Sequence, residues 1–99
     1  MPDQPFGSDE PNAKFSPGQI VATPKALISI PNEEILLALS RHIRGDWGTL
    51  DPHDVNVNEN ALKHGGRLFS EYQSTRNVTF WIITEWDRSV TTVLLPEDY

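Results

Sequence analysis

The chain has 99 residues, with 14 acidic side chains against 8 basic ones and a formal charge of −6. It contains no cysteine, which excludes disulfide scaffolds, thiol catalysis and cysteine-ligated zinc. The length suits one domain, no apolar run approaches the roughly 20 residues of a membrane span, and the first residues do not resemble a signal peptide. We therefore expect a small acidic protein of the cytoplasm that makes no contact with a membrane.

The first 17 residues differ in composition from the rest. They hold four prolines, scattered charges and only two phenylalanines, without the apolar period of a strand or a helix. Because such a segment buries too little surface to offset the entropy of ordering it, we expect residues 1–17 to be a flexible tail. Residues 18–99 then form a single compact domain.

The domain is predicted to open with a short strand and a short helix. Residues 18–22 contain β-branched side chains, which favour a strand. Thr23 and Pro24 follow the pattern of a helix start, with threonine as the N-cap and proline in the first turn. This helix must end before Pro31, since proline disfavours helical backbone in the residue before it. Residues 26–30 would also suit a strand.

Two longer helices are expected next. The first begins with Asn32 as its N-cap and ends at Gly45, with acidic side chains in its first turn and basic ones in its last, as the helix dipole favours. Its apolar side chains, spaced three and four apart, are Ile35, Leu36, Leu39 and Ile43. The second runs from Asp51 and Pro52 to Gly65, and its several asparagines make it depend on packing against the rest of the fold.

The last third is predicted to be β-structure, with strands at 67–73, 78–84 and 89–95. The middle strand is apolar on both faces, which indicates a central position. The order of one strand, three helices and three strands predicts an α+β fold, with two to three helices packed on one face of a small, mostly antiparallel sheet. Strand 18–22 would join as the fourth. An exposed last strand could pair with a second copy and form a homodimer.

Two segments carry a family resemblance. They are GDWGTLD at residues 45–51 and WIITEWDRSVTTVLLP at residues 81–96. Together they resemble a family of short bacterial proteins described as plasmid-related, and the resemblance covers residues 18–99. It implies a bacterial cytoplasm and a mobile-element origin. It assigns no activity, cofactor or catalytic residue.

The predicted layout is also similar to that of barnase-like ribonucleases, which place a glutamate base, phosphate-binding arginines and a histidine acid on one face of the sheet. Here Glu71 would be the base, and Arg88, with Arg67 and Arg76, would bind phosphate. The late-strand histidine is missing, and the charge of −6 opposes phosphate binding. Alternatively, these side chains form exposed cross-strand ion pairs, each contributing roughly 0.2–1 kcal/mol.

Two tryptophans are candidate contact residues. Trp47 lies between glycines in a loop, where it either anchors an interface or folds back into the core, and the small size of the domain favours the core. Trp86 lies in the turn between the last two strands and is harder to bury. We therefore expect Trp86, Asp87 and Arg88 to form the main contact site, with Trp47 as a secondary candidate.

The remaining polar residues indicate no metal site and no cofactor. His42, His53 and His64 come from separate elements, whereas zinc requires three or four convergent ligands. His42 and His64 fall at predicted helix C-termini, where a partial positive charge is favoured. The carboxylates are interspersed with basic residues, so dense mimicry of DNA phosphates, as in an anti-restriction protein, is the weakest of the functional hypotheses.

These observations predict a non-catalytic protein-binding or regulatory module of mobile-element origin, which acts through a protein partner and does not bind nucleic acid. The alternative is a barnase-like ribonuclease or toxin-type domain, or a degenerate form of one, that uses Glu71 and Arg88.

Overall fold

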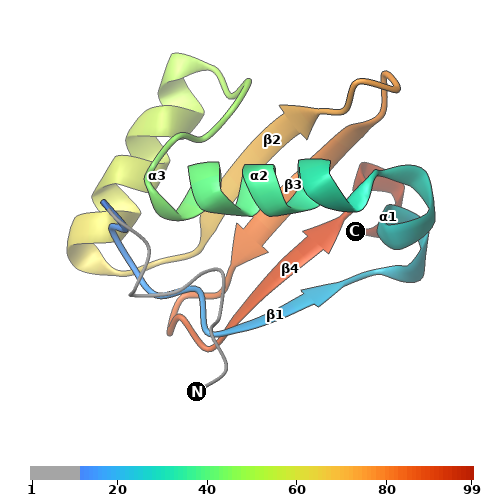
Figure 1. The fold of residues 1–99 in the computed structure, drawn as a ribbon. Coiled ribbons are helices and arrows are strands. Elements are labelled where there is room, and N and C mark those ends of the chain that lie inside the picture. The colour runs from blue at the N-terminus through green and yellow to red at the C-terminus, as the bar shows by residue number, and fades with distance from the viewer. Residues whose placement is uncertain (1–11) are drawn as a thin grey trace.

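The computed structural model describes residues 12–99 and confirms the α+β class and the expected order of elements (Figure 1). The elements are β1 (Gln19–Ala22), α1 (Pro24–Ser29), α2 (Asn32–Ile43), α3 (Pro52–His64), β2 (Leu68–Gln73), β3 (Thr79–Thr84), β4 (Val90–Leu94) and the short 3-10 helix η1 (Pro96–Asp98).

The four strands form one sheet in the order β1-β4-β3-β2. β2, β3 and β4 form an antiparallel meander, and β1 pairs in parallel with β4. The expectation that β3 is central is confirmed. The last strand is not an edge strand, because β1 occupies its outer side, and this corrects the suggestion that β4 could pair with a second copy.

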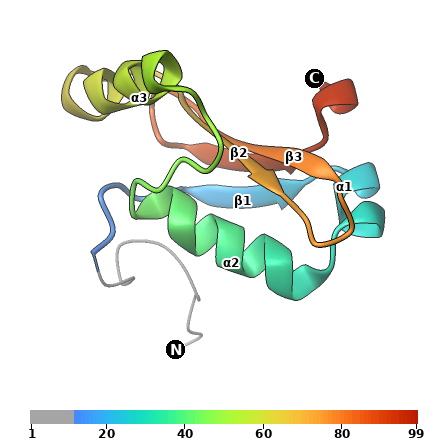
Figure 2. The ribbon, with the colours of Figure 1, turned by 90° about the horizontal axis from the view of Figure 1, so that it is seen from above.

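α2 lies across one face of the sheet, whereas α3 lies beyond the β2 end and on the other side of the sheet from α2 (Figures 1 and 2). The main core fills the space between α2, α1 and the sheet. Its buried side chains are Ala26, Ile30, Ile35, Ala38, Leu39, Ile43, Tyr72, Phe80, Ile82, Val93 and Leu95. Burying each of the larger ones stabilises the fold by roughly 1.5–3 kcal/mol.

The start of α2 differs from the prediction by one residue. Pro31 is the N-cap, Asn32 is already helical, and no side chain caps the first turn. Proline suits this position because it donates no hydrogen bond and its carbonyl accepts from Glu34 N at 3.0 Å. The Glu34 carboxylate accepts instead from Ser74 Oγ and from the backbone and hydroxyl of Thr75, which attaches the β2–β3 turn to α2 and lowers the pKa of Glu34.

The outer edge of β2 is covered by two other segments. The Asn58 side chain on α3 donates to Phe69 O at 2.6 Å and accepts from Phe69 N at 3.1 Å. Glu71 N donates to Trp47 O, and Thr49 N donates to Glu71 O. Glycine is required between these two loop residues, since a Cβ on Gly48 would lie 1.9 Å from Glu71 O. The covering protects this edge from pairing with other chains.

The folded part begins before Gly18, which corrects the predicted tail. Residues 1–11 of that tail lie outside the described residues. Lys14 N donates to Ile43 O at 2.7 Å. The Phe15 ring packs against both the main core and a smaller buried cluster of Trp47, Ala61 and Leu68. Pro17 is fully buried. Residues 14–17 are ordered because α2 and the sheet offer an apolar seam that Phe15 and Pro17 fill.

A chain of polar side chains crosses the core under α2. The Pro17 carbonyl can only accept, so the Thr91 hydroxyl donates to it at 2.7 Å. Thr84 then donates to Thr91 at 2.7 Å, and His42 Nε2 donates to Thr84 at 2.9 Å. The remaining nitrogen, Nδ1, accepts from Ser70 Oγ at 2.6 Å. These directions require a neutral imidazole protonated on Nε2.

This arrangement corrects the prediction for His42. The side chain is near the helix C-terminus, as expected, but it is 0% exposed. Burial, and to a lesser extent the positive charge of Arg88, lowers the pKa of His42 to about 3. Desolvation of the charged ring therefore outweighs the helix dipole at this position.

Candidate functional site

The sheet face opposite α2 carries a group of aromatic side chains. Strand alternation and register place Phe69 beside Ile83, and Glu71 beside Trp81, on this face. α3 and η1 lie on the same side of the sheet near its two ends (Figure 2). Between them Phe69 and Trp81 remain partly exposed. This surface, defined by Arg67, Phe69, Glu71, Trp81, Ile83 and Tyr99, is called the open face below.

Trp81 is the centre of the open face. Its ring meets Phe69 edge to face with a centroid distance of 5.0 Å, and it meets Tyr99 in the same way at 5.8 Å. Tyr99 directly follows η1 and is 69% exposed. A cavity of about 260 Å³ lies among these rings, with Arg67 and Ile83 completing its lining. Its walls are mostly apolar, as is usual for binding pockets.

Arg67 forms one wall of the cavity and is held in place on two sides. Its Nη1 donates to the Tyr99 hydroxyl at 2.9 Å, and its Nε lies 3.5 Å from Glu85 Oε1. The hydrogen bond to Tyr99 and the charge of Glu85 raise the pKa of Arg67. The ion pair leaves little net charge at this end of the cavity.

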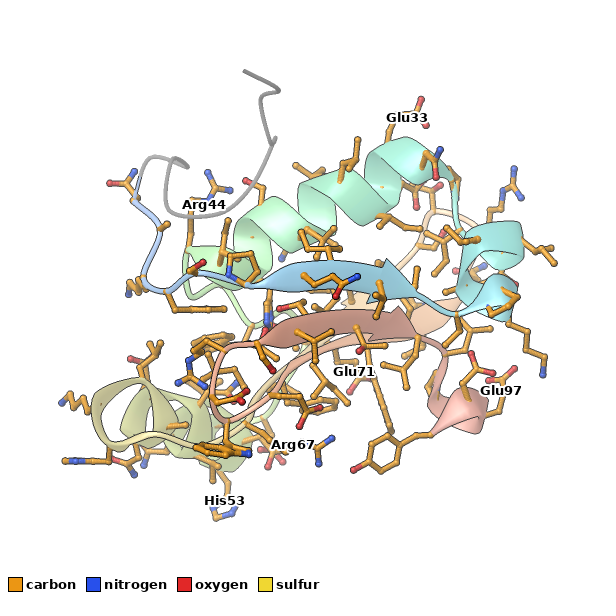
Figure 3. The ribbon with its side chains drawn as sticks, turned by 90° about the horizontal axis from the view of Figure 1, so that it is seen from below. Glu33, Arg44, His53, Arg67, Glu71 and Glu97 are labelled. Carbon is orange, nitrogen blue, oxygen red and sulfur yellow. The ribbon has the colours of Figure 1, made fainter. Side chains whose placement is uncertain are left out.

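Glu71 carries the unbalanced charge. Within residues 12–99 its carboxylate has no hydrogen bond or ion pair, although its backbone is paired with the loop around Gly48. Figure 3 shows Glu71 and Arg67 on the side of the sheet away from α2. A carboxylate without a partner among residues 12–99 is therefore paired with Trp81 across the β2–β3 register.

Of the predicted contact residues, Trp86 is exposed and Trp47 is not. Trp86 is 69% exposed in the β3–β4 turn. Asp87 accepts from Ser89 N at 3.0 Å, which stabilises the turn. Hydrogen bonds from the side chain and then the backbone of Ser89 lower the pKa of Asp87. Trp47 is 4% exposed and donates from Nε1 to Glu59 at 2.9 Å. It therefore takes the core position that was the favoured alternative.

Arg88 acts as a structural link between α3 and the β3–β4 turn. Its backbone is in the left-handed region, with φ 62°, and its guanidinium lies 5.8 Å from the centre of the Phe15 ring. The guanidinium donates to four backbone carbonyls, those of Ala61, Gly66, Glu85 and Trp86. Because these hydrogen bonds use the N–H groups of Nη1 and Nη2, the Arg88 guanidinium is not available to bind a partner.

The structure brings together only part of the ribonuclease alternative: Glu71 and Arg67 share the open face, whereas Arg88 is bound to carbonyls of Ala61 and Gly66. Arg88 lies against Phe15, which contacts His42 on the α2 side of the sheet, whereas Glu71 lies on the open face. His42 is buried on the side away from Glu71, and His53 and His64 are on α3. General acid–base cleavage needs two such groups within reach of one substrate, and His42, fully buried under α2, cannot be the partner of Glu71.

Phe69, Trp81 and Tyr99 were not among the site residues predicted from the sequence. The apolar run of β3 predicts a central strand, which is correct, but it does not say what covers each face, and α3 lies toward one end of the second face instead of over its middle. The sequence signal that could have found them is the alternation of side chains along the strands. It places Phe69 and Trp81 on the face of the sheet that does not carry the core residues Tyr72 and Phe80.

The chain matches no family model, and no curated protein and no solved structure was found to match it. In the part of the chain from residue 12 onward, no three histidine or carboxylate side chains are grouped to hold a metal ion. Over the same residues, no helix has the length and apolar character to cross a membrane.

Proposed function

We propose that this chain is a non-catalytic protein-binding module and that the open face around Trp81 is its contact surface. The observation that supports this is the aromatic cavity itself. Three aromatic side chains and Arg67 surround a space of about 260 Å³ that is large enough for one side chain of a partner. Pockets lined by tryptophan, tyrosine and arginine are where a few residues supply most of the binding energy of protein interfaces.

Trp86 is a second, weaker candidate for the contact. It follows Glu85, which pairs with Arg67 at the edge of the cavity. A partner seated on the open face would therefore reach the β3–β4 turn. Its exposed ring adds contact area there, whereas its neighbours Asp87 and Arg88 are held in hydrogen bonds to the turn and to α3. The composition and the plasmid-related resemblance favour a bacterial cytoplasm as the place where the module acts.

The proposal is tested by comparing variants in partner capture and then in direct binding. Trp81→Ala should abolish retention of a protein that the wild-type chain captures from a bacterial lysate, while Trp86→Ala should weaken it. The purified partner should then bind wild type in calorimetry and not Trp81→Ala. Leu37→Ala is the matched control, since Leu37 is 60% exposed but on α2, across the sheet.

Each variant needs a near-ultraviolet circular dichroism spectrum to show that it is folded. Equal capture and equal affinity for wild type and a folded Trp81→Ala would contradict the proposed surface. Loss of binding with Trp86→Ala alone would move the contact to the turn.

A further inference from the structure

The charges around the aromatic cavity indicate what kind of partner segment the open face can accept. This inference rests on the proposed function. Arg67 is paired with Glu85, and at the other end of the sheet Glu97 lies 3.7 Å from Lys25. Asp98 accepts from Thr23 and from the backbone of Leu95.

Glu71 differs from these groups because its carboxylate has no partner among residues 12–99. It lies directly opposite Trp81 in the β2–β3 register. Side chains opposite each other in antiparallel strands have Cβ atoms about 4.5–5.5 Å apart. A group that fills the cavity against Trp81 therefore brings the neighbouring part of the same ligand within reach of Glu71.

We propose that the open face binds a protein segment in which an apolar anchor, aromatic or branched, enters the cavity and a neighbouring lysine or arginine pairs with Glu71. The cavity of about 260 Å³ has room for such an anchor. The free carboxylate of Glu71 and the indole of Trp81 together favour a cation. A lysine or arginine there would be attracted by the negative charge of the carboxylate and by the face of the indole ring.

The charge of the whole chain also favours a basic partner segment. A net charge of −6 attracts a basic segment over several ångströms and repels phosphate or a strongly acidic peptide. Arg67 does not reverse this preference, because its charge is already neutralised by Glu85 and its side chain is held against Tyr99. The anchor thus sets the position of the segment, and Glu71 sets its charge preference.

The test uses a displayed library of random ten-residue peptides, selected on the wild-type chain after depletion on Trp81→Ala. The selected peptides should contain an aromatic or branched apolar residue next to lysine or arginine. For a synthetic peptide of this kind, Glu71→Gln should weaken binding by about threefold to tenfold and reduce its salt dependence. Glu71→Lys should prefer the same peptide with its basic residue changed to glutamate.

Glu33→Gln is the matched control for charge. It removes one exposed carboxylate from α2, on the opposite side of the sheet from Glu71 (Figure 3), and should leave the affinity within about twofold of wild type. An equal effect of Glu33→Gln and Glu71→Gln would show that only the overall charge matters, which overturns the role of Glu71.

The outcomes separate this inference from the proposed function. Peptides that require Trp81 but carry no basic residue, or that bind Glu71→Gln as well as wild type, overturn the inference and leave the binding surface standing. Enrichment of acidic residues would assign the recognition to Arg67 and overturn it as well. If no selected peptide depends on Trp81, both the inference and the proposed surface are contradicted.

Discussion

Lowering the pH from 8 to 5 should destabilise the fold through one residue, His42. The imidazole is fully buried, and its two nitrogens are committed to the Ser70 and Thr84 hydroxyls as a neutral ring. Protonation would turn Nδ1 from a hydrogen-bond acceptor into a donor that faces the Ser70 hydroxyl. The unfolded chain carries no such restriction, so it binds a proton that the folded chain excludes.

The size of the effect follows from the two pKa values. The pKa of His42 is about 3 in the folded chain and about 6.5 in an unfolded one. Because the folded value is the lower one, the contribution of neutral His42 to stability is complete above pH 6.5 and is lost as the pH falls toward 3. At pH 5 the pH is about 1.5 units below the pKa of histidine in the unfolded chain. Proton binding to the unfolded chain therefore lowers the free energy of unfolding by about 2 kcal/mol.

The assay is urea unfolding at both pH values for wild type and His42→Gln. Glutamine can accept from Ser70 and donate to Thr84, so it retains the pattern of hydrogen bonds without a titrating ring. Between pH 8 and pH 5 the wild-type chain should lose about 2 kcal/mol more of its unfolding free energy than the variant. His53→Gln, at an exposed position on α3, is the control and should behave as wild type.

Equal losses in wild type and His42→Gln would contradict the assignment of the pH dependence to His42. If the variant does not fold, the Cε1 proton of His42 provides the same test in wild type by nuclear magnetic resonance. Its chemical shift should stay constant from pH 8 to pH 5, and a titration midpoint near pH 6.5 would show that the ring is neither buried nor locked in one tautomer.

Three further variants test the packing that supports the open face. Asn58→Ala should lower the unfolding free energy by about 2 kcal/mol, because it removes both hydrogen bonds to Phe69; a loss below about 0.5 kcal/mol in urea would argue against the covered edge. Arg88→Lys should lower the melting temperature and speed amide exchange in the last turn of α3, whereas unchanged exchange there would remove its linking role. Phe15→Ala should cost about 1–3 kcal/mol in thermal or urea unfolding, and a wild-type value would return residues 12–17 to the predicted tail.

The local elements could be predicted because their signals are local. Asp51 accepts from Asp54 N at the start of α3, as its position before Pro52 indicates, and Thr23 accepts from Ala26 N in the same way at α1. The 3.6-residue period of α2 correctly gave its buried face, apart from Leu36, which is exposed on the flank.

The tertiary roles of single residues could not be predicted in this way. Arg88 has the sequence context of an exposed turn residue, and only the approach of α3 supplies the carbonyls that it binds. His42 has the pattern of an exposed histidine at a helix end, and only the register of β2, β3 and β4 brings Ser70, Thr84 and Thr91 together beneath it.

The three tryptophans allow the most direct test of the proposed contact surface, because each indole gives its own nitrogen–proton signal. Trp47 is buried, Trp81 is in the open face and Trp86 is in the exposed turn. A titration with the peptide that the display selection enriches should shift the Trp81 indole signal strongly and leave that of Trp47 in place. A shift of the Trp86 signal with Trp81 unchanged would contradict the account and place binding at the β3–β4 turn.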